Sequence, residues 1–400
     1  MALVFLISLA FRLYYVFSIR GPLSDEGIDT YAGIIYFSNL LKGQLASNFF
    51  QYNYEHPAFA KLVFGFFAKA LSGLDFGWVG QSGVPWVSFS DIMRARIGAA
   101  VTTSFAPVVL FIFVRDISED LRAALAASIM LATYPYYAFY GALAYLDVIC
   151  STFMLACLWL LYRSQMTRLH YLILSGIFAG LSVASKYPGI LTMAMILLLL
   201  ILKWTKRDGR AGRRKDLEAM GVVLLCGLIT FYLANPIIWT DPSMLVKSLL
   251  YHQGRFGVGD PARPWFLPLL WIVRRTPPIA FVGVLAGCRQ IASRNQLSLS
   301  SDLGRFMFPI YLLVTIVFLV INTDKAENYF TIAVPPIAAM AGIGISKISD
   351  YLSQKLADSS RGAISIDPRT VAGVLVTLNF VTSLLIIILN LIPFLQRFIP

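Results

Sequence analysis

Long apolar stretches recur along this chain from end to end, and they restrict its fold more than any other feature. Crossing the hydrocarbon core of a membrane takes about 20 mostly apolar residues as a helix, which satisfies its own backbone hydrogen bonds within the lipid. The composition agrees, because 58% of the 400 residues are hydrophobic, only 14% are charged and the mean hydropathy is +0.72. We therefore predict an all-α, polytopic transmembrane protein.

Eleven apolar segments are predicted to span the membrane. No repeat and no Pro-rich or Gly/Ser-rich linker divides the chain, so a single transmembrane domain over residues 1–400 is expected. The first segment contains Arg12 and lacks a small-residue cleavage pattern, so it is predicted to be a span rather than a signal peptide. The predicted spans lie near residues 2–19, 93–114, 121–140, 142–162, 171–185, 187–203, 219–238, 277–291, 306–322, 329–346 and 370–396.

Basic residues are concentrated in short connections between these spans, which explains the net charge of +12 without nucleic acid. The densest group, in residues 203–215, is predicted to be cytoplasmic, so the amino terminus is cytoplasmic and the carboxy terminus is outside. Two long connections, 20–91 and 238–276, then lie on the non-cytoplasmic side. Within the first, residues 30–41 and 57–71 are apolar but short, and they are predicted to be interfacial helices.

An acid pair, Asp25-Glu26, directly follows the first span in the string SDEGIDTYAG, and Tyr31 comes soon after it. Two adjacent acids at a membrane boundary are costly to bury without partners or a function. The alternative is a solvated helix start, with Ser24 as the cap and the acids in the first turn. The residues alone leave both interpretations open.

Two further motifs carry ionisable groups. Glu55 and His56 precede Pro57, a pattern that is also typical of an ordinary helix start with a structural histidine. Asp147 lies in AYLD near the outer end of a predicted span, and an acid within the membrane is rare without a function.

Several cations fall on the predicted non-cytoplasmic side. Each of them alone is explained by an interaction with lipid headgroups. Together they are able to hold a lipid-linked phosphate at the level where the hydrocarbon ends. They are Arg96 at the start of the second span, Lys186 in SKYPG, Arg274 and Arg275 before two prolines, and Lys325 close to Tyr329.

The order of these motifs resembles that of the protein O-mannosyltransferases and the lipid A aminoarabinose transferases. The resemblance continues through NPIIWTDP at residues 235–242, Tyr251-His252, PWFLPLLWIVRRTPP and KAENYF, and it covers nearly the whole chain. It implies the GT-C fold, with an outer cavity built by the first large connection. It also implies a polyprenyl-phosphate sugar donor and a hydroxyl acceptor that enters from the non-cytoplasmic side.

The resemblance also implies roles for individual residues. Asp25 is expected to be the general base and Glu26 to support it or bind the acceptor, while the cations and Tyr329 hold the donor phosphate. No cofactor is expected to be required. In the aminoarabinose type, however, acids matching Glu55 and Asp147, with a histidine resembling His252, bind a divalent metal, and this is carried over as a secondary expectation. The residues expected to line the acceptor side or the pocket are Tyr31, Glu55, His56 and Asp147.

The chemistry favours a single inverting displacement. Phosphate is a good leaving group that needs cations more than a proton, and a carboxylate base contributes about 10²- to 10⁴-fold. No residue stands out as the nucleophile that a retaining route requires. We therefore expect an integral membrane enzyme, which in a prokaryote would lie in the plasma membrane. Its expected partners are a polyprenyl-phosphate-linked sugar, a hydroxyl-bearing acceptor and membrane lipids.

Two alternatives are weighed against this interpretation. Outer cations and intramembrane acids also mark the substrate pathway of a transporter or flippase of a lipid-linked sugar. Such proteins often have two related halves, and no such internal symmetry is evident in this sequence. An oligosaccharyltransferase is disfavoured because the chain contains no WWD string and no large soluble domain.

Overall fold

The structure is a computed structural model that describes residues 1–23, 25–76, 86–205, 210–257, 264–293, 299–322, 327–359 and 367–396. Within these ranges the elements are helices, with no β-strand. Four of them are short 3₁₀ helices: η1 (Ser47–Phe50), η2 (Tyr187–Ile190), η3 (Pro236–Ile238) and η4 (Glu327–Ala333). The α-helices are α1 (Ala2–Ser18), α2 (Glu26–Leu41), α3 (Phe59–Ala70), α4 (Phe89–Thr103), α5 (Phe105–Ser118), α6 (Leu121–Thr133), α7 (Pro135–Ala142), α8 (Leu146–Ser164), α9 (Leu169–Ser185), α10 (Leu191–Thr205), α11 (Arg210–Leu233), α12 (Ser243–Gly257), α13 (Leu267–Arg275), α14 (Pro278–Ser293), α15 (Leu299–Ile321), α16 (Val334–Ser359) and α17 (Pro368–Gln396).

Each of the eleven predicted spans coincides with helical structure, and the prediction of an all-α integral membrane protein is confirmed. Among the described residues, six segments are long and apolar enough to cross a membrane, and α13 and α14 form a further pair that is bent by 110°. The six are Phe89–Ser118, Leu146–Ser164, Tyr187–Thr205, Gly212–Leu233, Glu327–Asp358 and Pro368–Leu385. Shorter apolar helices are Ala2–Ser18, Leu121–Thr133, Leu169–Ser185 and Phe306–Ile321.

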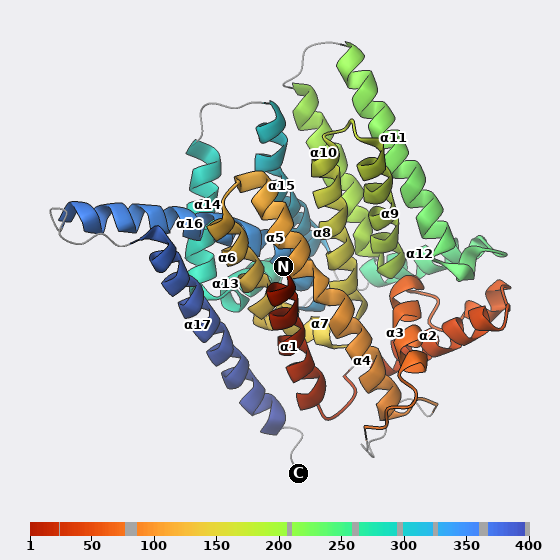
Figure 1. Ribbon diagram of the computed structural model, residues 1–400. Helices are drawn as coiled ribbons and strands as arrows, with labels where there is room; N and C mark the ends of the chain where they lie inside the picture. The colour runs from red at the N-terminus through yellow and green to blue at the C-terminus, as the bar shows by residue number, and fades with distance from the viewer. Residues whose placement is uncertain are drawn as a thin grey trace.

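The helices α8 to α11 stand side by side, with α9 packed against both α8 and α11 (Figure 1). The facing ends of α10 and α11, which flank the basic connection, lie at the top of the bundle in this view. In contrast, α12 lies near the lower ends of α9 and α11, and α2, α3 and the last residues of α1 lie lower still (Figure 1). Segments predicted to share a side of the membrane therefore lie at a common end of the bundle, while the assignment of the upper end to the cytoplasm stays a prediction.

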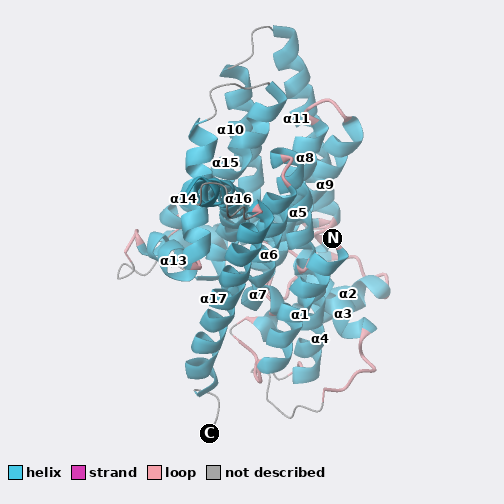
Figure 2. Cartoon of the chain, turned by 60° about the vertical axis from the view of Figure 1, so that its left-hand side comes forward, coloured by secondary structure: helices cyan, strands magenta, loops and turns pink. Residues whose placement is uncertain are grey.

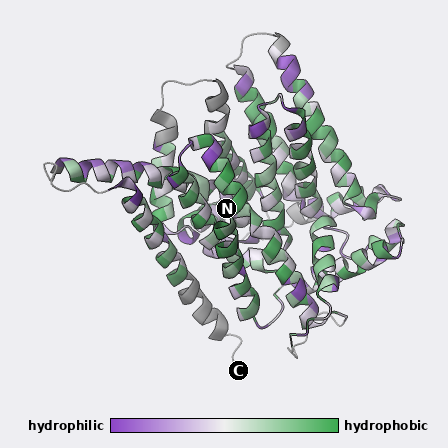
Figure 3. Ribbon diagram, viewed as in Figure 1, coloured by the Kyte–Doolittle hydropathy of each residue, from purple (hydrophilic) through white to green (hydrophobic). Residues whose placement is uncertain are grey.

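Helix α16 lies across the bundle rather than along it, since it runs sideways in Figure 1 and is seen nearly end-on in Figure 2. Its first half packs on α6 and α14 through glycines, and a Cβ added to Gly344 would lie 1.8 Å from the carbonyl oxygen of Gly283. Such small residues allow helix backbones to approach closely at a crossing. Its far half is hydrophilic (Figure 3). The predicted span 329–346 is thus helical, but it begins a helix that crosses its neighbours.

The two predicted interfacial segments form α2 and α3, which pack against each other beside the lower end of the bundle (Figure 2). Glycines allow this contact, because a Cβ on Gly33 would lie 2.1 Å from the carbonyl oxygen of Lys61 and one on Gly65 would lie 2.0 Å from that of Gly33. Their backbones therefore touch. The placement of the two helices at the membrane surface stays a prediction.

A break between α7 and α8 prepares the site. The helix α7 ends at Ala142, and the carbonyl of Gly141 accepts a hydrogen bond of 2.8 Å from Thr103 Oγ1, which accepts one of 2.8 Å from Arg12 Nε. Backbone groups freed within a membrane protein need such partners, because no water reaches them there. The chain then restarts as α8 and carries Asp147 in its first turn.

Candidate active site

A buried ion pair joins the start of α2 to α4. Arg96 donates to Glu26 from Nε at 2.8 Å and from Nη2 at 2.6 Å, and both side chains are fully buried. The same carboxylate accepts hydrogen bonds from the backbone N–H groups of Leu23, at 2.9 Å, and Ala144, at 3.0 Å. Glu26 therefore fixes both the first turn of α2 and the break before α8.

The remaining donors of Arg96 are also occupied. They contact the carbonyl oxygens of Ile19, at 2.8 Å, and Gly21, at 2.6 Å, and the sulfur of Met93 at 3.8 Å. A guanidinium has five N–H groups, and here none is left for a phosphate. The prediction that Arg96 lines the donor phosphate pocket is therefore corrected: this arginine holds α1, α2 and α4 together.

A second buried ion pair joins α8 to the connection between α9 and η2. Lys186 Nζ donates to both carboxylate oxygens of Asp147, at 2.7 and 2.8 Å, and Asn328 donates to one of them at 2.8 Å. The ammonium also lies 4.5 Å from the centre of the Tyr329 ring. An ammonium has three N–H groups, so the pair with Asp147 leaves one for another acceptor.

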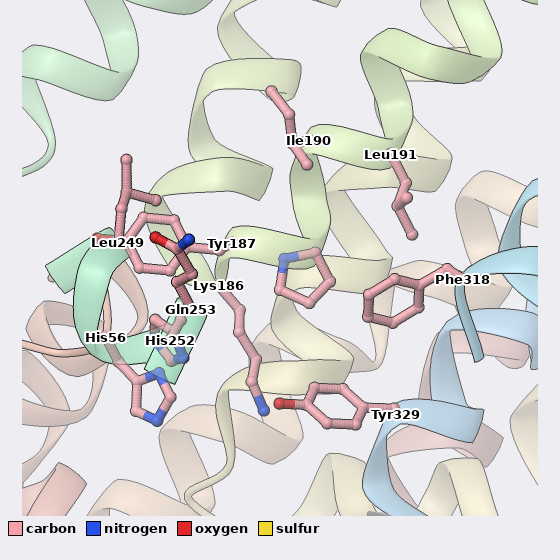
Figure 4. Close-up of a pocket in the computed structure, with 11 residues that line it drawn as sticks. His56, Lys186, Tyr187, Ile190, Leu191, Leu249, His252, Gln253, Phe318 and Tyr329 are labelled. Carbon is pink, nitrogen blue, oxygen red and sulfur yellow. The ribbon is translucent and has the colours of Figure 1, made fainter. Parts of the chain in front are cut away.

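A cavity of about 360 Å³ opens beside Lys186, a volume within the usual range of ligand pockets of roughly 300–1,000 Å³. Figure 4 shows its lining: the polar ends of Lys186 and Tyr329 and the rings of His56 and His252 lie in the lower part of the view, Ile190 and Leu191 lie in the upper part, and Phe318 lies between them. The residues around it are His56, Lys186, Tyr187, Pro188, Ile190, Leu191, Leu249, His252, Gln253, Phe318 and Tyr329.

The two histidines come from distant parts of the chain. His56 precedes α3, whereas His252 lies on α12, and their ring centres are 5.2 Å apart. His252 Nε2 and Ser248 Oγ both contact the carbonyl oxygen of Glu55, at 2.6 and 2.9 Å. The two motifs EHP and YH, which are separated in sequence, are thus neighbours at the cavity.

Asp25 is the exposed residue directly before α2, next to the anchored Glu26. One turn further on, Asp29 is buried and accepts a hydrogen bond of 2.7 Å from Asn53 Nδ2. Burial raises the pKa of Asp29 to about 7, with Lys61 opposing the shift and the charge of Asp25 adding to it. The ammonium of Lys186 also acts on Asp29, so the start of α2 lies within electrostatic reach of the cavity.

The paired arginines at the end of α13 differ in direction. Arg274 is exposed, whereas Arg275 contacts the carboxylate of Glu327 at 3.3 Å and lies 4.6 Å from the centre of the Tyr136 ring. The hydroxyl of Tyr136 donates to the same carboxylate. Neither arginine lines the cavity, and Lys325 lies outside the described residues.

The residues predicted for the acceptor side are not gathered in one place. Tyr31 packs edge-on against Tyr52, with ring centres 4.8 Å apart, and stacks on Trp86 at 5.8 Å. Only His56 of the four predicted residues lines the cavity, and Asp147 lies behind Lys186. Glu55 presents its carbonyl group to α12.

The expected metal ligands Glu55, Asp147 and His252 are not brought together. Both oxygens of Asp147 are bonded to Lys186, one of them also to Asn328, and an ammonium is an unfavourable neighbour for a divalent cation. Across the part of the chain that the structure describes, no group of three His, Cys, Asp or Glu side chains is placed to hold a metal ion. The secondary expectation of a metal at these residues is therefore not supported.

Several polar residues of the site escaped the sequence analysis. Asn328 bonds to Asp147, Asn53 bonds to Asp29, and Asn235 Oδ1 accepts from the backbone N–H of Ala58 at 2.7 Å. Asn53 lies between two tyrosines and Asn235 between Ala234 and Pro236, whereas Asn328 follows Glu327. Since a buried amide needs hydrogen-bond partners, the apolar setting is a signal that could have identified Asn53 and Asn235.

Comparisons with known proteins agree with this architecture. Residues 30–239, just over half of the chain, match the family model described as dolichyl-phosphate-mannose-protein mannosyltransferase. No curated protein sequence matches the chain.

Solved structures are similar over almost the whole chain. ArnT from Cupriavidus metallidurans bound to undecaprenyl phosphate matches with a TM-score of 0.62 and 16% identity, over 97% of this chain and 70% of ArnT. The structure of ArnT in the apo state gives a TM-score of 0.64 at 16% identity, over 96% of this chain and 76% of ArnT. The oligosaccharyltransferase AglB from Archaeoglobus fulgidus, in complex with an inhibitory peptide and a dolichol-phosphate, gives 0.57 at 12% identity, over 95% of this chain and 55% of AglB. The predicted GT-C fold is thereby confirmed.

Proposed function

Because the chain belongs to the dolichyl-phosphate-mannose-protein mannosyltransferase family, and is thus a glycosyltransferase of the GT-C type, we propose that it uses a polyprenyl-phosphate sugar as donor. The sugar moves to a hydroxyl group of a protein, lipid or glycan acceptor on the non-cytoplasmic face of the membrane. The transfer is a single displacement that inverts the anomeric carbon.

The observation that carries this proposal is the divided lining of the cavity beside Lys186. One part presents an ammonium, a phenol and two imidazoles, and the other presents Ile190, Leu191 and Phe318 (Figure 4). A polyprenyl phosphate has the same division, with an anionic head and a hydrocarbon tail. Cationic and hydrogen-bonding groups recognise phosphate, while apolar walls bury the first isoprene units.

The related structures support the choice of donor. One ArnT structure is described as bound to undecaprenyl phosphate, and the AglB complex contains a dolichol-phosphate. Both are long isoprenoid phosphates. This chain shares the fold of those proteins and carries a cavity of matching chemistry, so we assign it a ligand of this class.

In the proposed reaction the acceptor oxygen attacks the anomeric carbon as the bond from that carbon to the phosphate oxygen breaks. Asp25 takes the proton of the acceptor hydroxyl, and the polyprenyl phosphate leaves with the bonding electron pair. Asp25 suits this role because it is exposed while its neighbour Glu26 is anchored by Arg96. Lys186 stabilises the leaving phosphate with its remaining N–H group, since this is where negative charge increases.

The test is a transfer assay with the purified protein in vesicles, radiolabelled polyprenyl-phosphate sugars and soluble hydroxyl acceptors. A transferase releases polyprenyl phosphate and labels the acceptor. A flippase moves the intact donor across the bilayer and leaves the sugar–phosphate bond unbroken. Movement of intact donor with no cleavage of any donor would reject the proposal.

A further inference from the structure

The segment of residues 53–58, which carries Glu55 and His56, is held from several sides although it forms no α-helix itself. From α12, Ser248 and His252 contact the carbonyl oxygen of Glu55. From the start of η3, Asn235 accepts from the N–H of Ala58. These contacts fix Glu55 and Ala58, on either side of His56, against α12 and η3.

The opposite side of the segment is held by an acid and a base from α2 and α3. Asn53 donates to Asp29 from its side chain at 2.7 Å, and its carbonyl oxygen accepts from Lys61 Nζ. The same ammonium donates to the carbonyl oxygen of His56 at 2.9 Å. One buried lysine therefore binds both ends of the stretch from Asn53 to His56, and Asn53 connects the lysine to the acid.

The backbone of Asn53 requires this support. Its φ is +54°, in the left-handed region that side-chain-bearing residues enter at a cost and that Asn tolerates better than most. Two hydrogen bonds from buried partners hold it there, one through the side chain and one through the carbonyl group. The turn at Asn53 sets the direction in which the chain continues to His56.

Simple packing of α2 against α3 does not call for these groups. The two helices already touch through Gly33 and Gly65. Asp29 is 3% exposed and Lys61 is fully buried, and placing an acid and a lysine at such positions costs free energy that an apolar pair would avoid. The arrangement instead makes hydrogen bonds to the segment that carries the cavity residue His56.

We propose that Asp29, Asn53 and Lys61 are positioning residues that hold His56 at the wall of the donor cavity. This rests on the proposed function, because it takes the cavity to be the site of the lipid phosphate. None of the three residues lines the cavity itself. They act on donor binding only through the place of the His56 ring.

The test is a double-mutant cycle on the purified full-length protein, with undecaprenyl phosphate as the probe and Kd as the readout. We expect Asn53→Gly, which keeps the left-handed backbone accessible, and His56→Ala each to weaken binding about tenfold. In the His56→Ala background, Asn53→Gly should then change Kd by less than about twofold. Equal effects in both backgrounds, or an unchanged Kd for a folded Asn53→Gly protein, would overturn the proposal.

Controls separate this proposal from the function on which it rests. Lys69→Met changes an exposed lysine on the same helix α3 and should leave Kd unchanged. If Lys186→Met weakens binding but Asn53→Gly does not, the positioning role alone fails. If Lys186→Met also leaves Kd unchanged, the cavity is not the phosphate site and the proposed function fails with it. Should Asn53→Gly not fold, Lys61→Arg takes its place in the cycle under the same criterion.

Discussion

Two buried ion pairs in this membrane protein, Arg96–Glu26 and Lys186–Asp147, differ in whether the cation keeps an N–H group for a further acceptor. Arg96 uses all of its N–H groups on Glu26, two backbone carbonyls and a sulfur atom. Lys186 makes its bonds to Asp147 and still faces a cavity. Under the proposed function, the unused hydrogen-bonding capacity of the buried cation, rather than its charge or position, distinguishes Lys186 from the structural Arg96.

The largest effect is expected at Asp25, the residue next to the Arg96–Glu26 pair. If Glu26 is committed to structure, then its exposed neighbour Asp25 carries the chemistry, and Asp25→Asn should lower turnover by at least about 10²-fold while donor binding survives. Single-turnover rates and thermal stability measured on the same purified variant test this. A helix-capping acid would instead lose about 1 kcal/mol of stability at most and keep its turnover, because Asn caps nearly as well as Asp.

Breaking the Arg96–Glu26 pair should destabilise the fold rather than affect the reaction alone. Arg96→Met leaves Glu26 buried without its cation, so we expect a loss of about 3–5 kcal/mol in the free energy of unfolding. Thermal or denaturant unfolding in detergent measures the change. Arg214→Met is the control, because Arg214 pairs with Glu218 and both side chains are exposed, and it should cost about 0.5 kcal/mol or less. A stable Arg96→Met protein with weakened donor binding would contradict the structural role of Arg96.

Removing the Lys186–Asp147 pair should weaken donor binding more than it lowers the stability of the protein. Lys186→Met with Asp147→Asn removes both charges together, so no uncompensated ion remains in the buried site. We expect this double variant to fold, yet to bind undecaprenyl phosphate at least about tenfold more weakly, because one charge-assisted hydrogen bond to phosphate is lost. Titration of the lipid phosphate and a melting curve on one preparation provide both values. Wild-type affinity in the folded double variant would contradict the role of Lys186.

A smaller difference is expected between the two arginines at the end of α13. Arg275 is partly exposed and contacts Glu327 and Tyr136, so Arg275→Ala should cost about 1 kcal/mol or less. Arg274→Ala should change neither stability nor donor affinity, since this side chain is exposed and does not line the cavity. Melting curves and lipid titrations of the two variants side by side check the order.

The last expected effect depends on pH. Burial raises the pKa of Asp29 to about 7, above its usual value near 3.9, so its contribution to stability is complete below about pH 4 and is lost as pH rises through 7. Asp29→Asn carries no charge at any pH and keeps an oxygen for Asn53. The melting temperature of the variant minus that of the wild type should therefore be larger at pH 8 than at pH 5. A difference in melting temperature that does not vary with pH would contradict the raised pKa.

The sequence predicted the helical segments well because an apolar run is a local property. Each of the eleven predicted segments is helical, and the two segments predicted to be interfacial form α2 and α3. The course of α16 across the bundle depends instead on contacts such as Gly344 against Gly283, between residues far apart in the chain. No periodicity within one segment reports such a crossing.

The candidate site was predictable in composition but not in arrangement. Lys186 and Tyr329 were expected near a phosphate and do line one cavity, and His56 lies on its wall. The sequence could not distinguish Arg96 from Lys186, because the partners that occupy Arg96 include Glu26, 70 positions away. Asn53 was missed because its role depends on Asp29 and Lys61, which belong to two different helices.

The contacts between residues 53–58 and the region of residues 235–252 set an order for the biogenesis of the protein. A ribosome adds about 5–20 residues per second, so the segment that carries His56 leaves it roughly 10–40 s before His252 does. During that interval Glu55 and Ala58 lack the partners that hold them in the finished structure. The nascent chain therefore passes through the insertion machinery with the cavity beside Lys186 unassembled, and the lining is complete only after η4, which carries Tyr329, has been synthesised.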